Sequence, residues 1–304
     1  FSEWHNTKLV STPIDVYYPP REERISHFRP IKDFTRISLL NTFLCIGAVL
    51  YGYPLKLFRL FRTVIYTVFS LLFFLVGAFI TTIFAIVYFA ICPKNEKTKL
   101  NYHKLLWLIS KFVIHNIPGV KFQCENRFKE TFEKPAVIIS NHQSHLDLMC
   151  AMMLTPKMVI LTNDWVWNNP FYGKIIQFAE FYPVSNGFEE SLTHIKDLVS
   201  RGYSVLVYPE GTRSADCSIL RFHRGAFYIA EELNLDIIPL FIHGPGKVLP
   251  KTSFYLKTGK IYLDIKERIK PTDLQFGKTF RERTKKIEQY YKNTYNRIKI
   301  TKTA

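Results

Sequence analysis

The sequence predicts an α/β fold, in which a mixed sheet is flanked by helices, together with an N-terminal helical membrane segment. Two observations lead to this prediction. Two long runs in the first third of the chain contain no charged residue. After them, short apolar runs rich in β-branched residues alternate with stretches of helical period, which is typical of a sheet covered by helices.

The charge-free runs are residues 37–55 and 63–93. Each is long enough to cross the roughly 30 Å hydrocarbon core of a bilayer. Neither has the polar face that a helix on the surface of a soluble domain needs, so membrane insertion is favoured over burial in a core. Basic residues flank both ends of the second run. The charge pattern therefore does not decide between two spans and a hairpin in one leaflet.

The rest of the chain supplies the elements of the sheet. The fourth and fifth candidate strands are apolar enough to be buried on both faces. Candidate strands lie at residues 120–124, 136–140, 158–162, 204–208, 237–243 and 260–265. Candidate helices lie near residues 146–154, 189–201 and 225–234.

The two ends of the chain differ from its middle. Residues 1–36 are polar and contain prolines, which indicates a linker or arm. From residue 278 onward, basic residues alternate with apolar and aromatic ones, which indicates a helix that docks onto anionic lipid. The chain starts at Phe1, and no signal segment precedes the first apolar run. We therefore expect a piece of a longer polypeptide without a signal peptide.

The composition limits the kind of partner. Lys and Arg number 41 against 25 Asp and Glu, a formal net charge of +16. Such an excess favours nucleic acid, an acidic lipid surface or a phosphorylated substrate. The charge-free runs and the lack of a recognisable reader motif argue against nucleic acid. The five cysteines are scattered without a C-x-x-C pair, so we expect neither a disulfide framework nor a metal site.

The first candidate site follows the strand predicted at residues 136–140, where the sequence reads NHQSHLDLM. We expect residues 141–144 to form a turn that caps the next helix, with His142 at the end of the strand and Asp147 in the first helical turn. A carboxylate there can accept the second N–H of the imidazole and stabilise the imidazolium, as a general base requires. The spacing alone arises easily by chance, but its place between strand and helix strengthens it. His145 is interpreted as a packed neighbour.

The second candidate site is VLVYPEGTRS, residues 205–214, where a buried strand ends in Pro-Glu-Gly-Thr-Arg. Gly211 permits an unusual backbone angle, Thr212 supplies a hydroxyl, and Arg213 can bind a phosphate or a carboxylate in a bidentate way. In an arbitrary protein, a solvated turn would be the better interpretation. Here a second basic cluster, RFHRGAF, follows at residues 221–227, so we predict an anion site.

Together these segments resemble the phospholipid and glycerol acyltransferase family, the PlsC-like enzymes that include 1-acylglycerol-3-phosphate acyltransferases. The resemblance covers about residues 101–270. The family's N-H-x-x-x-x-D block matches residues 141–147, and its P-E-G-T-R-S block matches residues 209–214. Its F-x-x-G-A segment matches residues 222–226, and its later apolar stretch with proline matches residues 237–244.

The resemblance implies a glycerolipid acyltransferase-like sheet and a direct transfer. His142, held by Asp147, would take the proton of an acceptor hydroxyl, which attacks the thioester of acyl-CoA or acyl carrier protein. No metal and no cofactor are called for, since the acyl donor is a co-substrate. The favoured acceptor is the lysophospholipid 1-acyl-sn-glycerol-3-phosphate, which would become phosphatidic acid. We expect catalysis on the cytoplasmic side of the inner membrane, because the thioester donors are cytosolic.

The family's second block supplies the binding residues. The resemblance implies that Glu210, Gly211, Thr212 and Arg213 bind the phosphate or head group of the acceptor. The chain is then expected to divide into an arm at residues 1–36, membrane-associated helices at 37–100, an acyltransferase domain at 101–277 and a basic C-terminal helix at 278–304.

One departure from the family puts the acceptor in doubt. Between these blocks the family usually shows a Gly-x-x-F-I-D-R segment and an earlier lysine. Here EFYPVSNG stands, with Val184 and Ser185 at the Asp and Arg positions, and the lysine is missing. Lys174, or Arg221 together with Arg224, could substitute electrostatically.

The alternatives left open follow from this departure. The acceptor could be another hydroxylated lipid, such as a lyso-aminolipid or a pigment lipid. The chain could also be a non-catalytic lipid-binding module, or the acyltransferase part of a larger bacterial multifunctional protein.

Overall fold

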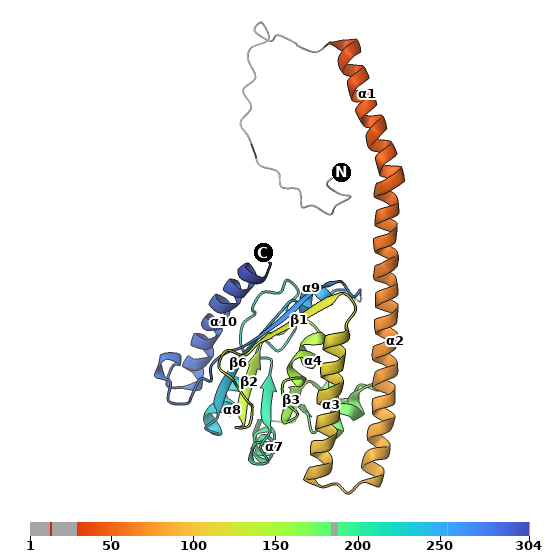
Figure 1. Ribbon diagram of the computed structural model, residues 1–304. Coiled ribbons are helices and arrows are strands. Elements are labelled where there is room, and N and C mark those ends of the chain that lie inside the picture. Colours follow the sequence, from red (N-terminus) through yellow and green to blue (C-terminus); the bar gives the residue numbers. More distant parts are fainter. Residues whose placement is uncertain (1–12, 14–28, 184–187, 254, 304) are drawn as a thin grey trace. The chain divides into compact units, whose positions relative to one another are not determined.

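The computed structural model describes residue 13 and residues 29–183, 188–253 and 255–303 (Figure 1). The chain divides into two compact units between Ile65 and Tyr66. Val184 and Ser185, as well as most of the arm expected at residues 1–36, lie outside the described residues.

The long apolar helix begins in the first unit. Helix α1 (Pro30–Gly47) continues through the π-helical segment η2 (Ala48–Gly52) into α2 (Tyr53–Ile91). By length and composition, Pro30–Ile91 is one helix able to cross a membrane. The expected helical membrane segment is therefore present as a candidate, and no turn separates the two charge-free runs.

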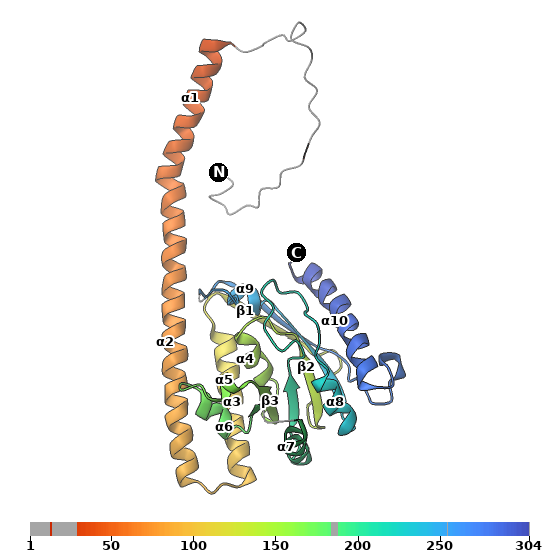
Figure 2. The same ribbon diagram turned by 180° about the vertical axis from the view of Figure 1, so that it is seen from behind.

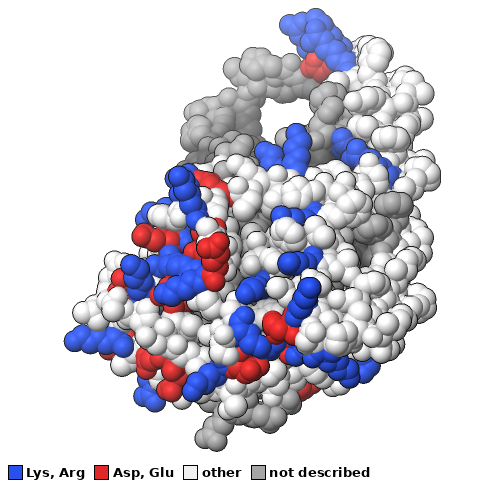
Figure 3. Space-filling view, turned by 60° about the horizontal axis from the view of Figure 1, so that its bottom comes forward, with Lys and Arg blue, Asp and Glu red and all other residues white. Residues whose placement is uncertain are grey.

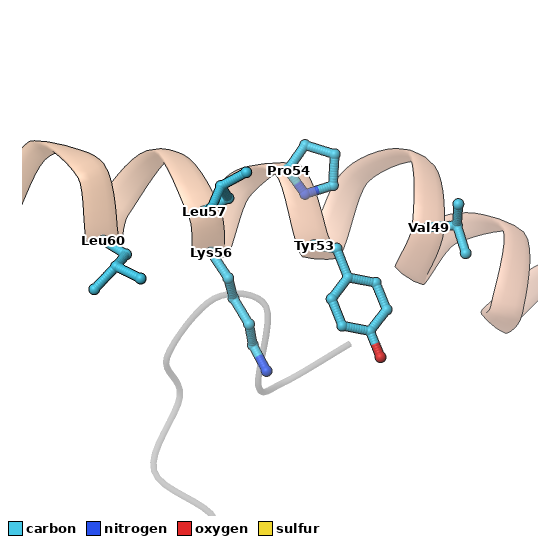
Figure 4. A pocket seen from close by; sticks show the side chains of 6 residues that line it. All are labelled: Val49, Tyr53, Pro54, Lys56, Leu57 and Leu60. Atoms are coloured by element: carbon cyan, nitrogen blue, oxygen red, sulfur yellow. The ribbon is translucent and has the colours of Figure 1, made fainter.

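A proline accounts for the π-helical segment. Pro54 has no N–H to donate within the helix, and the turn ahead of it widens, with the Tyr53 N–H donating to the carbonyl of Ala48. A shallow pocket opens around this proline (Figure 4). It is lined by Val49, Tyr53, Pro54, Lys56, Leu57 and Leu60. All six belong to this one helix, and none is a predicted site residue.

The second unit is built on a seven-stranded sheet of order β1-β7-β6-β2-β5-β3-β4. Its neighbours are parallel except for β6 and β7, which are antiparallel. The predicted mixed sheet is thus confirmed. The strands are β1 (Val120–Glu125), β2 (Ala136–Ser140), β3 (Met158–Thr162), β4 (Tyr182–Pro183), β5 (Ser204–Val207), β6 (Asp236–His243) and β7 (Gly259–Ile265).

The six predicted strands match these bounds to within one residue. The two strands expected to be buried on both faces, β5 and β6, are buried except at the last residue of β5, and β2 is buried along its whole length. Strand β4 was not predicted, because two residues that include a proline carry no period-2 signal.

Helices cover both faces of the sheet (Figures 1 and 2), with α8 and α10 on one side and α3 and α4 on the other. The helices after α2 are α3 (Glu96–Asn116), α4 (Leu146–Met152), α5 (Asp164–Trp167), α6 (Gly173–Phe178), α7 (Phe188–Ser200), α8 (Gly225–Glu232), α9 (Pro245–Val248), η4 (Leu274–Phe276) and α10 (Phe280–Thr303). Helix α3 starts where the Asn95 side chain accepts the Thr98 N–H at 2.9 Å. It runs through residue 101, where the main domain was expected to begin.

The basic C-terminal segment is a helix, as its pattern indicated, but one face of it is buried. Ile287, Tyr291, Tyr295 and Ile298 recur at helical spacing and are at most 7% exposed. The Tyr291 hydroxyl donates to the carbonyl of Ile139 in β2 at 2.7 Å. Tyr291 and Tyr295 of α10 therefore belong to the core of the second unit and are not available to lipid.

Part of the charge of the second unit is paired. Arg201 binds both carboxylate oxygens of Glu180, each at 3.0 Å, and forms a further ion pair with Glu96 at 2.6 Å. Lys99 forms an ion pair with Glu180 at 2.8 Å. On the face shown in Figure 3, basic and acidic side chains are interspersed. The positive excess on that face is therefore not a patch of a single sign.

Candidate active site

The site begins with an asparagine that extends the sheet. The buried Asn141 side chain donates to the carbonyl of Ile242 at 2.8 Å and accepts the Ile242 N–H at 2.9 Å. These two bonds continue the pairing of β2 with β6 by one residue through a side chain. The position of the next residue, His142, is fixed by this contact.

His142 and Asp147 lie in contact. The Nδ1 atom of His142 is 3.0 Å from Oδ2 of Asp147, whose carboxylate is fully buried. Because a carboxylate accepts the Nδ1–H, the neutral imidazole carries its lone pair on Nε2. The His142 side chain is 22% exposed, so the ring is accessible from outside. This arrangement can take a proton from a hydroxyl and stabilise the resulting imidazolium.

The same carboxylate holds the turn. Asp147 Oδ2 also accepts the N–H of Gln143 at 2.5 Å and of Ser144 at 2.8 Å. The residue that caps α4 is His145, which makes no capping bond with its side chain. The expected capping by residues 141–144 is reduced to one long bond, from the Leu146 N–H to Ser144 Oγ at 3.3 Å.

The turn after β5 forms hydrogen bonds with both the backbone N–H and the backbone carbonyl of His142. Glu210 Oε1 accepts the His142 N–H at 2.9 Å, and the Ser214 N–H donates to the His142 carbonyl at 2.7 Å. The other oxygen of Glu210 accepts the Leu220 N–H at 3.0 Å. Both oxygens of this buried carboxylate are therefore occupied by backbone. Its geometry fits a positioning role, whereas binding of the acceptor by Glu210 stays a prediction.

The remaining residues of the turn face outward. Gly211 has φ +65°, the left-handed region that glycine adopts without strain, and a Cβ there would lie 3.2 Å from the His223 ring. Thr212 is exposed and Arg213 is half-buried. Burial, followed by the charge of Arg213, lowers the pKa of His145. Arg213 is the residue of this turn whose side chain can bind an anionic group.

Burial raises the pKa of Glu210 from 4.5 to about 7, against the two backbone donors that favour its ionised form. The folded protein then binds this proton more tightly than the unfolded chain, so stability falls as the pH rises from 4.5 to about 7. Since a tenfold change in proton affinity corresponds to about 1.4 kcal/mol, the loss approaches about 3 kcal/mol.

Glu210→Gln is expected to remove this part of the pH dependence. Chemical unfolding in detergent, followed by circular dichroism across that pH range, measures it. The wild-type protein should lose stability relative to the variant as the pH rises. Parallel curves for the two proteins would contradict the raised pKa.

Two contributors to the site were not predicted, and the first is an aromatic ring. Tyr208 stacks on His142, with ring centroids 4.2 Å apart and planes inclined by 23°. Its hydroxyl is buried and has no hydrogen-bond partner within the described residues. Burial, and then the charge of Asp147, raises the pKa of Tyr208. The ring limits the rotation of the imidazole from one face. The only signal in the sequence was a tyrosine directly before Pro-Glu-Gly-Thr-Arg.

The second contributor is helix α10. The amide of Gln143, next to His142, donates to the Tyr295 hydroxyl. Nδ1 of His243 at the end of β6 lies 3.0 Å from the same hydroxyl. Burial lowers the pKa of His243 to about 4. The ring is therefore neutral at pH 7, and its Nδ1 can accept a hydrogen bond from the Tyr295 hydroxyl. Tyr295, which is far from His142 in the sequence, thus stabilises the loop that contains His142 and Gln143.

Tyr295→Phe is expected to lower the free energy of unfolding by about 1–3 kcal/mol, because the Gln143 amide and the His243 ring lose a buried partner. Thermal and chemical unfolding in detergent would measure the loss. Tyr255→Phe, at a side chain that is 53% exposed, serves as the control. Equal stabilities of the two variants would contradict a supporting role of Tyr295.

The other residues that the sequence analysis singled out lie outside the His142 site. Phe222 is buried against Phe227 and Tyr291, so it is part of the core. The proposed electrostatic substitutes are dispersed. Lys174 donates to Gln177 within α6 at 3.0 Å, Arg221 acts electrostatically on Glu288 of α10, and Arg224 is exposed at the start of α8.

The structure is thus a mixed α/β sheet in which a histidine held by a carboxylate follows the central strand β2, an arrangement that can support general-base chemistry. The family model described as Acyltransferase matches residues 119–243, which include the His142 turn, β5 and β6. This segment is therefore similar to the acyltransferase family. The crystal structure of the 1-acyl-sn-glycerophosphate acyltransferase PlsC from Thermotoga maritima has the same fold. Its TM-score is 0.69 at 20% identity, over 79% of this chain and 98% of that one.

Curated relatives carry names of the same kind. The chloroplastic 1-acyl-sn-glycerol-3-phosphate acyltransferase LPAT1 of Arabidopsis thaliana is 30% identical over 125 residues, 40% of this chain and 35% of that protein. The human 1-acyl-sn-glycerol-3-phosphate acyltransferase beta is 25% identical over 184 residues, 59% of this chain and 66% of that protein. The chain thus spans about a third of the Arabidopsis protein and covers less than two thirds of either.

Proposed function

We propose that this protein is an O-acyltransferase that moves a fatty acyl group from acyl-CoA or acyl carrier protein to the free hydroxyl of a lysophospholipid. The acceptor is 1-acyl-sn-glycerol-3-phosphate, and the product is phosphatidic acid. The observation that carries the proposal is the His142 ring, which lies 3.0 Å from buried Asp147 and whose side chain is 22% exposed. The match of residues 119–243 to the family model described as Acyltransferase supports it.

The reaction needs one proton carrier. Nε2 of His142 takes the proton of the acceptor hydroxyl, whose oxygen attacks the thioester carbonyl carbon. The C–S bond of the resulting tetrahedral intermediate breaks, and the imidazolium returns the proton to the leaving thiolate. An ester and a free thiol result, without a covalent acyl-enzyme. Asp147 stabilises the imidazolium throughout, and Arg213 binds the phosphate of the acceptor.

The apolar helix supports a site at a membrane, where the lipid acceptor resides. The protein would then lie in the inner membrane, with the second unit on the cytoplasmic side, where thioester donors are made. Val184 and Ser185, in place of the aspartate and arginine of the family, favour a second candidate. In it the acceptor is another hydroxylated lipid, such as a lyso-aminolipid or a pigment lipid.

The test is acyl transfer by the purified protein in detergent. Labelled acyl-CoA or acyl carrier protein is supplied with lysophosphatidate, monoacylglycerol or a lyso-aminolipid, and thiol release and lipid products are measured. Phosphatidic acid as the main product supports the first candidate, and acylation of another lipid alone supports the second. Binding of lysolipid without transfer to any acceptor would indicate a non-catalytic module.

A further inference from the structure

A lysine from outside the matched family segment reaches the site. Lys251 follows α9 in the loop that leads to β7. Its Nζ donates to the carbonyl of Arg213 at 2.7 Å and, more weakly, to Thr212 Oγ1 at 3.3 Å. This ammonium group therefore lies on the Glu-Gly-Thr-Arg turn, beside the residue expected to bind the acceptor.

No acidic side chain neutralises this lysine in the part of the chain that the structure describes. Both of its partners are uncharged oxygens, and one of its three N–H groups is left for a ligand. Arg213 likewise forms no ion pair among the described residues. Within the described residues, neither Arg213 nor the Lys251 ammonium that binds this turn forms an ion pair.

The acids closest in sequence to this turn are already engaged. Asp216 accepts from the Ser214 hydroxyl at 2.8 Å and from the Ser218 backbone and hydroxyl at 3.0 and 2.7 Å. Both oxygens of Glu210 accept backbone N–H groups. The segment from Gly244 to Lys260, which contributes Lys251, holds four lysines and no aspartate or glutamate.

Two cations on one turn fit a phosphate monoester. Such a group carries about −1.5 to −2 charges at pH 7 and three acceptor oxygens, and a guanidinium and an ammonium provide complementary donors. We propose that Lys251 and Arg213 together bind the phosphate monoester of the acceptor, with Lys251 as the cation that selects a phosphorylated acceptor. This inference rests on the proposed function. In it, Lys251 supplies the positive charge of the family's arginine, in whose place this chain has Ser185.

The place of the turn favours the acceptor over the donor as the source of this phosphate. The turn bonds directly to the peptide of His142 through Glu210 and Ser214, so an anion bound there lies near the reacting hydroxyl. In 1-acylglycerol-3-phosphate the free hydroxyl and the phosphate are on neighbouring carbons. In acyl-CoA the pantetheine arm separates the phosphates from the thioester.

The test compares Lys251→Met with Lys257→Met, an exposed lysine of the same loop. Each full-length variant is assayed with lysophosphatidate and with monoacylglycerol at fixed acyl-CoA. Lys251→Met should lower kcat/KM for lysophosphatidate by about tenfold, mainly through KM, because a charged hydrogen bond is lost. Transfer to monoacylglycerol and the KM for acyl-CoA should match the Lys257→Met control. Lys251→Arg should restore most of the lost selectivity.

The outcomes separate this inference from the proposed function. An unchanged KM for lysophosphatidate, or equal losses with both acceptors, would overturn the role of Lys251. A rise in the KM for acyl-CoA alone would assign the phosphate to the donor and also overturn it. A wild-type protein inactive with every acceptor would sink the proposed function instead. In that case, equilibrium binding of lysophosphatidate tests the role of Lys251. Equal affinities of the wild-type protein and Lys251→Met would contradict the inference.

Discussion

His142→Ala is expected to slow acyl transfer by about 100- to 10,000-fold, the usual contribution of a positioned general base. The imidazole is the accessible member of the His142–Asp147 pair, and its backbone is held by Glu210 and Ser214 independently of its side chain. The substitution should therefore remove the base and leave the turn in place. Initial rates with saturating acceptor, together with thermal unfolding, would measure both effects.

The matched control for this variant is His115→Ala, at an exposed histidine of α3. It should transfer acyl groups at the wild-type rate. A His142→Ala protein as active as this control would remove the imidazole from the mechanism and reopen the interpretation of the chain as a lipid-binding module.

Asp147→Asn is expected to cost about 100-fold or more in kcat with little change in KM. Oδ2 of Asp147 accepts three N–H groups, while its buried Oδ1 has no partner within the described residues. An amide can keep its oxygen in the Oδ2 position and place its NH2 where Oδ1 lies. The geometry of the turn is then retained, and the negative charge that stabilises the imidazolium is lost.

Rates across a pH series and the midpoint of thermal unfolding would test this second prediction. The midpoint of thermal unfolding should fall by a few degrees at most, because the amide oxygen keeps the two backbone contacts and the contact with the His142 ring. A variant that is as stable and as active as the wild type would mean that the charge of Asp147 does not act on the reaction.

Much of the secondary structure could be predicted from local pattern, although the 21-residue helix α3 was not predicted. Central strands such as β2 and β6 are apolar runs of ordinary strand length, and they were found to within one residue. Strand β4 and helix α9 are too short to show a period. The buried face of α10 was missed because its tyrosines resemble the aromatic residues of a lipid-facing helix until their partners in β2 and β6 are known.

The candidate site divides in the same way. His142, Asp147 and Glu210 stand in short motifs and could be named from the sequence, and the structure brings them together. The backbone contacts of Glu210 could not be foreseen, because they depend on how two strand ends lie side by side. Tyr208, Tyr295 and Lys251 act through contacts across the fold, and no local pattern marks them.

The packing of α10 has a consequence for biosynthesis. The apolar helix that ends at Ile91 is translated well before α10, whereas Gln143 finds its partner only when Tyr295 has been made. A nascent chain can therefore reach the lipid surface while the loop around the histidine still lacks its rear support. Transfer activity should then arise late in synthesis, after the polypeptide has already met the bilayer.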